Sequence, residues 1–223
     1  MNLKSALILL AASIAGSSFA QVTGTFTLDQ SGIVGTNVGN GFVGLSHDTF
    51  VPDAGHGPAY SFYGFCTDLE VEAAWNNPYY PYTRVDTNSF YKLNQYPTLS
   101  PQLGSEVSFI ANTYAFTGNA DVATAAQLAI WEVQGMSLAD VQTFLNGTFS
   151  ATVANKAAYY VATAEADYSA GDRSVSPWYE APINVDGRQI TQNFVQPVPE
   201  PSTIALGLGI LGLTLRRRST RKA

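Results

Sequence analysis

Cysteine is nearly absent from this sequence, because Cys66 is the only one among 223 residues. A protein that relied on internal disulfides would carry cysteines in pairs, so a disulfide framework is excluded. Four uses of one thiol remain: an intermolecular disulfide, an inert buried residue, a reactive thiol, or a covalent bond to another group. The surrounding segment reads "SFYGFCTDL", and its large apolar side chains, taken alone, favour the inert, buried residue.

Basic residues are also scarce. Between residues 21 and 198 the chain has 16 acidic and 5 basic residues, which gives a net charge of −11. Nucleic acids and anionic membranes are bound through a basic face, so we expect neither as a partner of this region. We interpret the acidity as a contribution to solubility.

Catalytic and cofactor motifs are missing as well. The sequence has no glycine-rich phosphate loop, no G-x-S-x-G and no His-Glu helix motif. We therefore expect neither hydrolase nor nucleotide chemistry, and no cofactor. His47 and His56 flank Asp48 and Asp53 in "HDTFVPDAGH". No third soft ligand is nearby, and the Gly, Pro and Asp content predicts a turn loop instead of a metal site.

The first 20 residues have the three parts of a secretory signal peptide. Lys4 lies near the start, the apolar core reads "ALILLAASIAG", and the small residues of "SSFA" precede Gln21. The core is short for a membrane span and is not followed by stop-transfer charges. We expect residues 1–20 to be cleaved, so that the exported chain begins at Gln21.

The C-terminal segment, residues 197–223, combines a Pro-Glu-Pro triplet, a short apolar run at 204–215, and a basic cluster. The residues that define this pattern are Pro199, Glu200, Pro201, Arg216, Arg217 and Arg218. The segment resembles the PEP-CTERM sorting tail of Gram-negative bacteria. That resemblance implies processing by an exosortase, transient anchoring in the inner membrane, and delivery to the cell surface or extracellular matrix. It concerns the address of the protein and says nothing about the region before it.

Residues 21–196 are predicted to form one exported domain with an α+β fold, in which strands of a β-sandwich or barrel carry an inserted helical block. Turn residues divide 21–70 into short segments rich in β-branched and aromatic residues, which predicts strands. A long ordered loop is expected over 75–97, where tyrosines alternate with Pro and Asn without a regular period. Asp186-Gly187 predicts a β-hairpin over 183–195. The tyrosines between Tyr79 and Tyr96 suit either a lid over the helices or a carbohydrate-stacking surface, and we favour the lid.

The helical block is predicted over residues 100–168. Ser100 followed by Pro101 is typical of a helix start, and "DVATAAQLAIWEV" forms the second helix. Ser137 with Asp140 three residues later predicts a capping box for the third helix, which Gly147 should end. A fourth helix is expected over 151–168, before Gly171.

Gln127 is unusual for its place in the second predicted helix. It lies one turn from Ile130 and Trp131, so a carboxamide stands on a helix face among large apolar groups. A half-buried Gln needs hydrogen-bond partners, which an apolar helix face does not supply. This residue changes the interpretation of Cys66, because it offers the lone thiol a chemical partner.

The segments "YGFCTDL" and "TAAQLAIWEV" resemble the two motifs of bacterial surface thioester domains. In that family an aromatic-flanked cysteine on a strand and a Gln in a "TQ-x-AIW"-type helix form an internal thioester. Gln127, Ala129, Ile130 and Trp131 match the pattern, whereas Ala126 stands where the family usually has Thr. The order of the two motifs matches as well, and the resemblance covers approximately residues 60–135.

The resemblance implies a Cys66–Gln127 thioester that an amine- or hydroxyl-bearing target opens, which leaves the target bound to Gln127. Such a bond must be kept from water, and the candidates for this shield are Tyr63, Phe65, Ile130 and Trp131. Proton transfer has Asp68, Glu132 and again Tyr63 as candidates, although each is also explained as an ordinary solvated or core-edge residue. The implied function is covalent adhesion at the cell surface, in which each molecule reacts once, so the resemblance implies a tether and not an enzyme in the usual sense. The alternative is a non-covalent structural or polysaccharide-binding protein of the biofilm matrix, in which Cys66 is inert.

Overall fold

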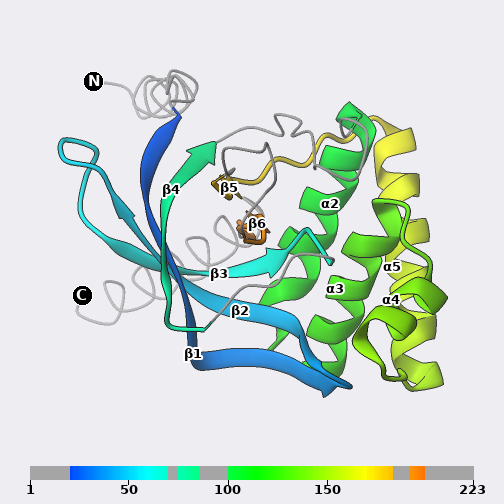
Figure 1. Ribbon diagram of the computed structural model, residues 1–223. Coiled ribbons are helices and arrows are strands. Elements are labelled where there is room, and N and C mark those ends of the chain that lie inside the picture. Colours follow the sequence, from blue (N-terminus) through cyan, green and yellow to red (C-terminus); the bar gives the residue numbers. More distant parts are fainter. Residues whose placement is uncertain (1–20, 70–74, 86–99, 183–190, 199–223) are drawn as a thin grey trace, which may run out of the picture.

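Six antiparallel strands close into a barrel in the computed structural model, which describes residues 21–69, 75–85, 100–182 and 191–198 (Figure 1). The order of strands around the barrel is β1-β2-β3-β6-β5-β4. Their bounds are β1 (Val22–Val38), β2 (Gly41–Pro52), β3 (Tyr60–Cys66), β4 (Pro78–Val85), β5 (Trp178–Glu180) and β6 (Phe194–Val195). The helices lie between β4 and β5 in the sequence, so the predicted α+β fold with an inserted helical block is confirmed.

Aromatic side chains fill the interior of the barrel. Phe26 stacks on Tyr82 and on Phe194, with ring centroids 4.5 and 4.8 Å apart, and Phe62 stacks on Tyr179 at 4.3 Å. Each of these side chains is almost fully buried. Such rings bury large apolar areas, and they come from five of the six strands, so their packing favours closure of the sheet.

The helices pack against one side of the barrel (Figure 1). Their bounds are α2 (Pro101–Tyr114), the short 3-10 turn η1 (Ala115–Thr117), α3 (Ala120–Val133), α4 (Leu138–Leu145) and α5 (Ala151–Ala170). The helix starts agree with the predictions. Ser100 caps α2, and Ser137 and Asp140 form a capping box at α4. Gly171 ends α5 in a left-handed conformation.

α3 is the central helix and carries the candidate site. Asn119 caps its start by accepting a hydrogen bond from the Val122 N–H at 3.2 Å. The alanines of α3, except the first residue, are fully buried, and their small side chains let α2, α5 and the barrel approach the helix axis closely. Thr124 ties α3 to β2, because its hydroxyl lies 3.2 Å from the Val43 carbonyl oxygen.

Three predictions about loops and turns need correction. Residues 78–85 form β4 and not part of a long loop, so Tyr82 is a barrel-core residue and not part of a lid over the helices; residues 86–97 lie outside the described ones. His47 and Asp48 belong to β2 and not to a turn loop. α4 ends at Leu145, and it is Asn146, in a left-handed conformation, that caps this end in place of Gly147.

The hairpin predicted over 183–195 is tested only at its end. Residues 183–190, which include Asp186-Gly187, lie outside the described residues. Phe194–Val195 is a strand as expected, and it pairs with β3 on one side and β5 on the other. Through these two short pairings, β6 connects β5, the strand that follows the helices, to β3, the strand that ends at Cys66.

Glu180, the last residue of β5, should make stability depend on pH. Burial raises its pKa from 4.5 to about 7. Its contribution to stability is therefore complete below pH 4.5 and is lost as the pH rises through about 7. In the wild type, ionisation of Glu180 should lower the free energy of unfolding by about 1–2 kcal/mol, a figure kept small because the side chain is only partly buried. Glu180→Gln cannot ionise, so this decrease should be absent from the variant.

Urea unfolding at pH 5 and pH 8 measures this effect. Asp172→Asn, which removes an exposed carboxylate after α5, is the matched control and should keep the wild-type difference between the two pH values. The remaining dependence in Glu180→Gln belongs to other buried carboxyls such as Glu106 and Glu132. An unchanged difference between the two pH values in Glu180→Gln would contradict the assignment.

Candidate functional site

Cys66 is the last residue of β3, at the end of the barrel that faces α3. Side chains alternate along a strand, so Cys66 shares the inner face of β3 with Gly64 and Phe62. The residue is 9% exposed. The lone thiol is therefore buried, but at the mouth of the barrel and not in its centre.

Gln127 reaches Cys66 from α3 with both ends of its carboxamide. The backbone N–H of Cys66 donates to Gln127 Oε1 at 3.0 Å, and Gln127 Nε2 donates to the carbonyl oxygen of Cys66 at 2.6 Å. Gln127 is 1% exposed. The structure thus supplies the hydrogen-bond partners that this polar side chain requires, and it places the amide carbon beside the residue that carries the thiol.

The thiol itself is held by the turn that follows β3. Cys66 Sγ donates to the Asp68 carbonyl oxygen at 3.0 Å, and the Asp68 N–H donates back to Sγ at 3.3 Å. The Asp68 carboxylate accepts a hydrogen bond of 2.6 Å from the Asn193 N–H. This last contact fixes the turn to the segment that leads into β6, so the position of the sulfur depends on the closed barrel.

Burial raises the pKa of the Cys66 thiol well above its ordinary value, and the nearby Asp68 carboxylate adds to this effect. The Asp68 backbone N–H and the Trp131 indole act in the opposite direction, and Asp48 raises the pKa further. Because desolvation is the largest of these effects, the thiol is protonated at neutral pH. A reaction at this sulfur therefore requires a group that accepts its proton.

A pocket with a volume of about 470 Å³ opens beside Cys66 and Gln127. Its inner wall is the barrel end, and its rim is formed by the β1–β2 turn and α4. Lining residues that matter here are Phe42, Ser46, Trp75, Trp131, Phe144 and Gln192. Phe42 and Trp75 meet edge to face, with ring centroids 5.8 Å apart. A small molecule can therefore reach the site along a largely aromatic rim.

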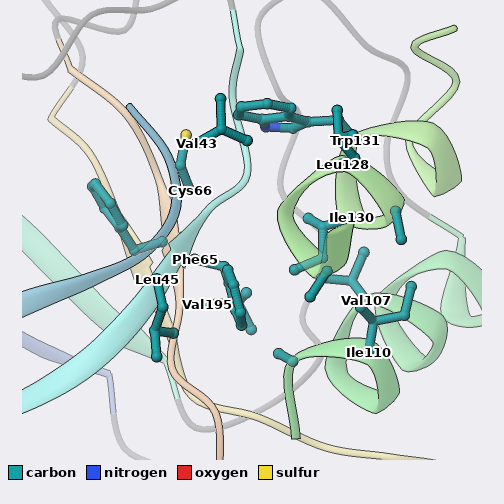
Figure 2. Packing of buried hydrophobic residues seen from close by; sticks show 14 of the residues in the cluster. Val43, Leu45, Phe65, Cys66, Val107, Ile110, Leu128, Ile130, Trp131 and Val195 are labelled. Atoms are coloured by element: carbon teal, nitrogen blue, oxygen red, sulfur yellow. The ribbon is translucent and has the colours of Figure 1, made fainter. Parts of the chain in front are cut away.

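Trp131 is the one predicted shield residue that lines the pocket. Its indole extends from α3 towards Cys66 and Val43 (Figure 2), and its nitrogen has no hydrogen-bond partner of ordinary geometry within the described part of the chain. Phe65 and Ile130 are fully buried in the layer between barrel and helices. They support the site from behind and do not contact the pocket.

Two other candidates lie away from the thiol. Tyr63 is on the outer face of β3, 36% exposed, where it packs against His47 with ring centroids 5.2 Å apart. The alternation of the strand points it away from Cys66, so its assignment as a shield or proton carrier is not supported. Glu132 follows Trp131 on α3 and leaves the helix in another direction from Gln127, about 140° around the axis.

Sequence reasoning missed a buried carboxyl inside the barrel. Asp48 on β2 is 0% exposed, and its Oδ1 atom has no hydrogen-bond partner among the described residues. Ser46 connects it to the pocket, because Ser46 Oγ lies 3.0 Å from Asp48 Oδ2 and itself lines the pocket. Such an unsatisfied buried oxygen costs about 1–3 kcal/mol. The segment "GLSHDTF" has no alternation of apolar and polar residues that would indicate a strand, so the sequence predicts a loop at Asp48.

Gly64 provides the space for Asp48. A Cβ atom at Gly64 would lie 2.3 Å from Asp48 Oδ2, and Ser46 pairs directly with Gly64 across the two strands.

The described residues show neither a metal site nor a membrane helix. They contain no group of three His, Cys, Asp or Glu side chains that could hold a metal ion, and none of their helices is both long and apolar enough to cross a membrane.

Comparison with known families identifies one segment. Residues 197–218 match the PEP-CTERM protein-sorting motif. The motif marks the protein for export, exosortase processing and sorting to the surface or extracellular space, as the sequence predicted; Pro199 and the rest of the tail lie outside the described residues. No curated protein and no solved structure matches the chain.

The fit between Gly64 and Asp48 predicts an energetic coupling. Gly64→Ala should lower the free energy of unfolding by about 1–3 kcal/mol, because the new methyl group forces the buried carboxyl to move. In an Asp48→Ala background the same substitution should cost at least about 0.5 kcal/mol less, since the oxygen that would clash is gone. Urea unfolding of the four proteins measures this difference. Equal costs in both backgrounds would show that Asp48 does not occupy the space above Gly64.

Proposed function

We propose that this surface-sorted protein attaches covalently to its target through an internal thioester between Cys66 and Gln127. The observation that carries the proposal is the pair of hydrogen bonds, of 3.0 and 2.6 Å, between the Gln127 carboxamide and the backbone of Cys66. Oε1 and Nε2 both contact Cys66, so the amide carbon between them lies next to the residue whose thiol would attack it. Residues 61 positions apart in the sequence are held in this arrangement.

The reaction is an acyl transfer within the protein. The S–H bond of Cys66 and the bond between Cδ and Nε2 of Gln127 break, a bond between Sγ and Cδ forms, and nitrogen leaves as ammonia with the thiol proton. Forming the bond replaces the hydrogen bond from Sγ to the Asp68 carbonyl. An amine or alcohol that enters the pocket then attacks Cδ, which releases the Cys66 thiol and leaves the target bound to Gln127. Each molecule reacts once, so the protein is a tether and not an enzyme.

The surroundings of the pair suit a bond that must survive until a target arrives. Cys66 and Gln127 are 9% and 1% exposed, and Trp131 covers the side of the pocket next to them. Restricted access of water slows hydrolysis of an activated acyl group. The pocket of about 470 Å³ still admits a small nucleophile. The site therefore combines protection with access from one direction.

The sorting tail supports the same function. A covalent tether is useful only where the protein itself stays attached, and residues 197–218 carry a surface-sorting motif. We propose that the apolar run at 204–215 holds the chain in the inner membrane until an exosortase processes it. The tether then acts in adhesion to amine- or hydroxyl-bearing groups at the cell surface or in the matrix.

Mass spectrometry of the purified exported protein tests the thioester. The protein should be lighter than its sequence mass by one ammonia and should have no titratable thiol. Methylamine should add its own mass and release one thiol, because the neutral amine attacks the thioester carbonyl.

Two variants serve as controls for this experiment. Cys66→Ala should have its full sequence mass and take up no methylamine, and Gln127→Ala should take up none while carrying a free thiol from the outset. Peptide mapping distinguishes a hydrolysed bond, which leaves Glu at position 127, from a bond that never formed. An intact Gln127 amide with a free thiol in fresh wild-type protein would refute the proposal. The Gln127 side chain would then serve only as a hydrogen-bond partner for the backbone N–H and C=O of Cys66.

Deletion of residues 197–223 tests whether this segment directs the protein to the cell surface. Without the tail the exported chain should appear in the culture medium, because nothing retains it at the surface. Cell fractionation and immunodetection measure the distribution. A matched variant, Arg216→Gln with Arg217→Gln and Arg218→Gln, keeps the triplet and apolar run and tests the basic cluster alone. Surface retention of the deleted form would contradict a sorting role for this segment.

A further inference from the structure

We propose that Asp48 and Ser46 form a proton relay for the Cys66–Gln127 acyl transfer, in which Asp48 exchanges protons with the reacting atoms through the Ser46 hydroxyl. This inference rests on the proposed thioester. It concerns two residues of β2 that neither the sequence motifs nor the sorting tail identify. The relay leads from the closed interior of the barrel to the pocket that contains the thiol.

The hydrogen bonds around Ser46 define the state of the relay. Ser46 Oγ lies 2.9 Å from the Gly64 carbonyl oxygen and 3.0 Å from Asp48 Oδ2. A hydroxyl donates one proton, and a carbonyl can only accept. Both contacts are satisfied when Ser46 donates to Gly64 and a protonated Asp48 donates to Ser46. The geometry therefore points to a neutral carboxylic acid at Asp48.

Burial agrees with this protonation state. Desolvation raises the pKa of Asp48 well above its ordinary value, and the charge of Asp29 adds to the effect, whereas the Ser46 hydrogen bond opposes it. Cys66 and Tyr82 also interact with Asp48, and Asp68 acts on both of them. Asp48 thus holds a proton that it can deliver, and its second oxygen, Oδ1, has no partner among the described residues.

Strand register brings the relay to the thiol. Ser46 pairs with Gly64, and Cys66 lies two residues further on the same face of β3. Diagonal neighbours of this kind have Cα atoms about 7–8 Å apart, a separation that one water molecule in the pocket can bridge between the two side chains. Ser46, Cys66 and Gln127 all line that pocket.

The proton balance is complete without another reactant. Asp48 passes its proton through Ser46 and water to Nε2 of Gln127, and the carboxylate that this transfer leaves at Asp48 accepts the thiol proton along the same path as Sγ attacks Cδ. The sum is thiol plus carboxamide giving thioester plus ammonia. Asp48 thus becomes the proton acceptor that the Cys66 thiol, with its raised pKa, needs for attack.

Opening of the thioester by ammonia is the reverse of its formation and uses the same relay. Purified wild type and variants are incubated with ammonium chloride, and thiol release and mass are followed over time. Asp48→Asn replaces the neutral acid by an amide of the same shape, so the fold should be kept while proton delivery is lost. We expect thiol release to be about 10²-fold slower. Ser46→Ala should be slowed similarly, and Ser46→Thr, which keeps the hydroxyl, should recover most of the rate.

The pH profile separates a relay from a structural effect. The ratio of wild-type to Asp48→Asn rates cancels the ionisation of ammonia. It should be largest where Asp48 is protonated and should decline as the pH rises through the raised pKa of this group. Asp29→Asn removes a carboxylate on the neighbouring strand β1 and should release the thiol at the wild-type rate. The pH at which the ratio declines should fall slightly, because Asp29 contributes to the raised pKa of Asp48.

The outcomes distinguish the two proposals. Wild-type protein without a thioester overturns both the tether and the relay. A thioester in wild type that opens at the same rate in Asp48→Asn and Ser46→Ala overturns the relay alone. If Asp48→Asn fails to fold, the Ser46→Ala and Ser46→Thr pair decides, because a rate lost in the first and kept in the second requires the hydroxyl.

Discussion

The two hydrogen bonds between the Gln127 carboxamide and the backbone of Cys66 are the contact on which the arrangement of this protein depends. They cross from the central helix to the end of the barrel, where both residues are almost fully buried. A backbone N–H or C=O left without a partner there costs about 1–3 kcal/mol. The contact therefore fixes the rotation and height of α3 against β3. α2 and α5 pack on α3, so their position relative to the barrel follows from it.

Small residues make this contact possible. Ala125, Ala126 and Ala129 are fully buried around Gln127, so the helix lies close enough to the barrel for one carboxamide to reach the strand. On the barrel side, Gly64 leaves room for Asp48. Large apolar side chains at either place would pack well, but they would separate the polar groups from each other. The site is thus a polar channel from Asp48 to Gln127 within a core that excludes water on most sides.

The polar groups of this channel do not optimise stability. Among the described residues, Asp48 Oδ1 has no hydrogen-bond partner, and the Trp131 indole nitrogen has none of ordinary geometry, although it acts on the Cys66 thiol. Natural proteins depart from consistent packing mainly at functional or strained sites. Asp48 and Trp131 both act on the Cys66 thiol, so departures of this kind at this end of the barrel agree with its interpretation as the site, separately from any motif. The sorting tail is independent of it, because it governs where the protein is placed and the barrel governs what it can react with.

The sequence by itself determined the features that depend on neighbours in the chain. Ser100, Ser137 and Gly171 end or begin helices through bonds within a few residues, and the tail is a linear signal that needs no fold. The proximity of Cys66 and Gln127 was predicted only through the resemblance of their two segments to a family. β4 was missed because Pro78 and Pro81 suggested a loop, and only pairing with β1 and β5 makes it a strand. Tertiary structure alone decided that Tyr63 points outward and that Asp48 points inward, since strand register and barrel closure are set by contacts far apart in the sequence.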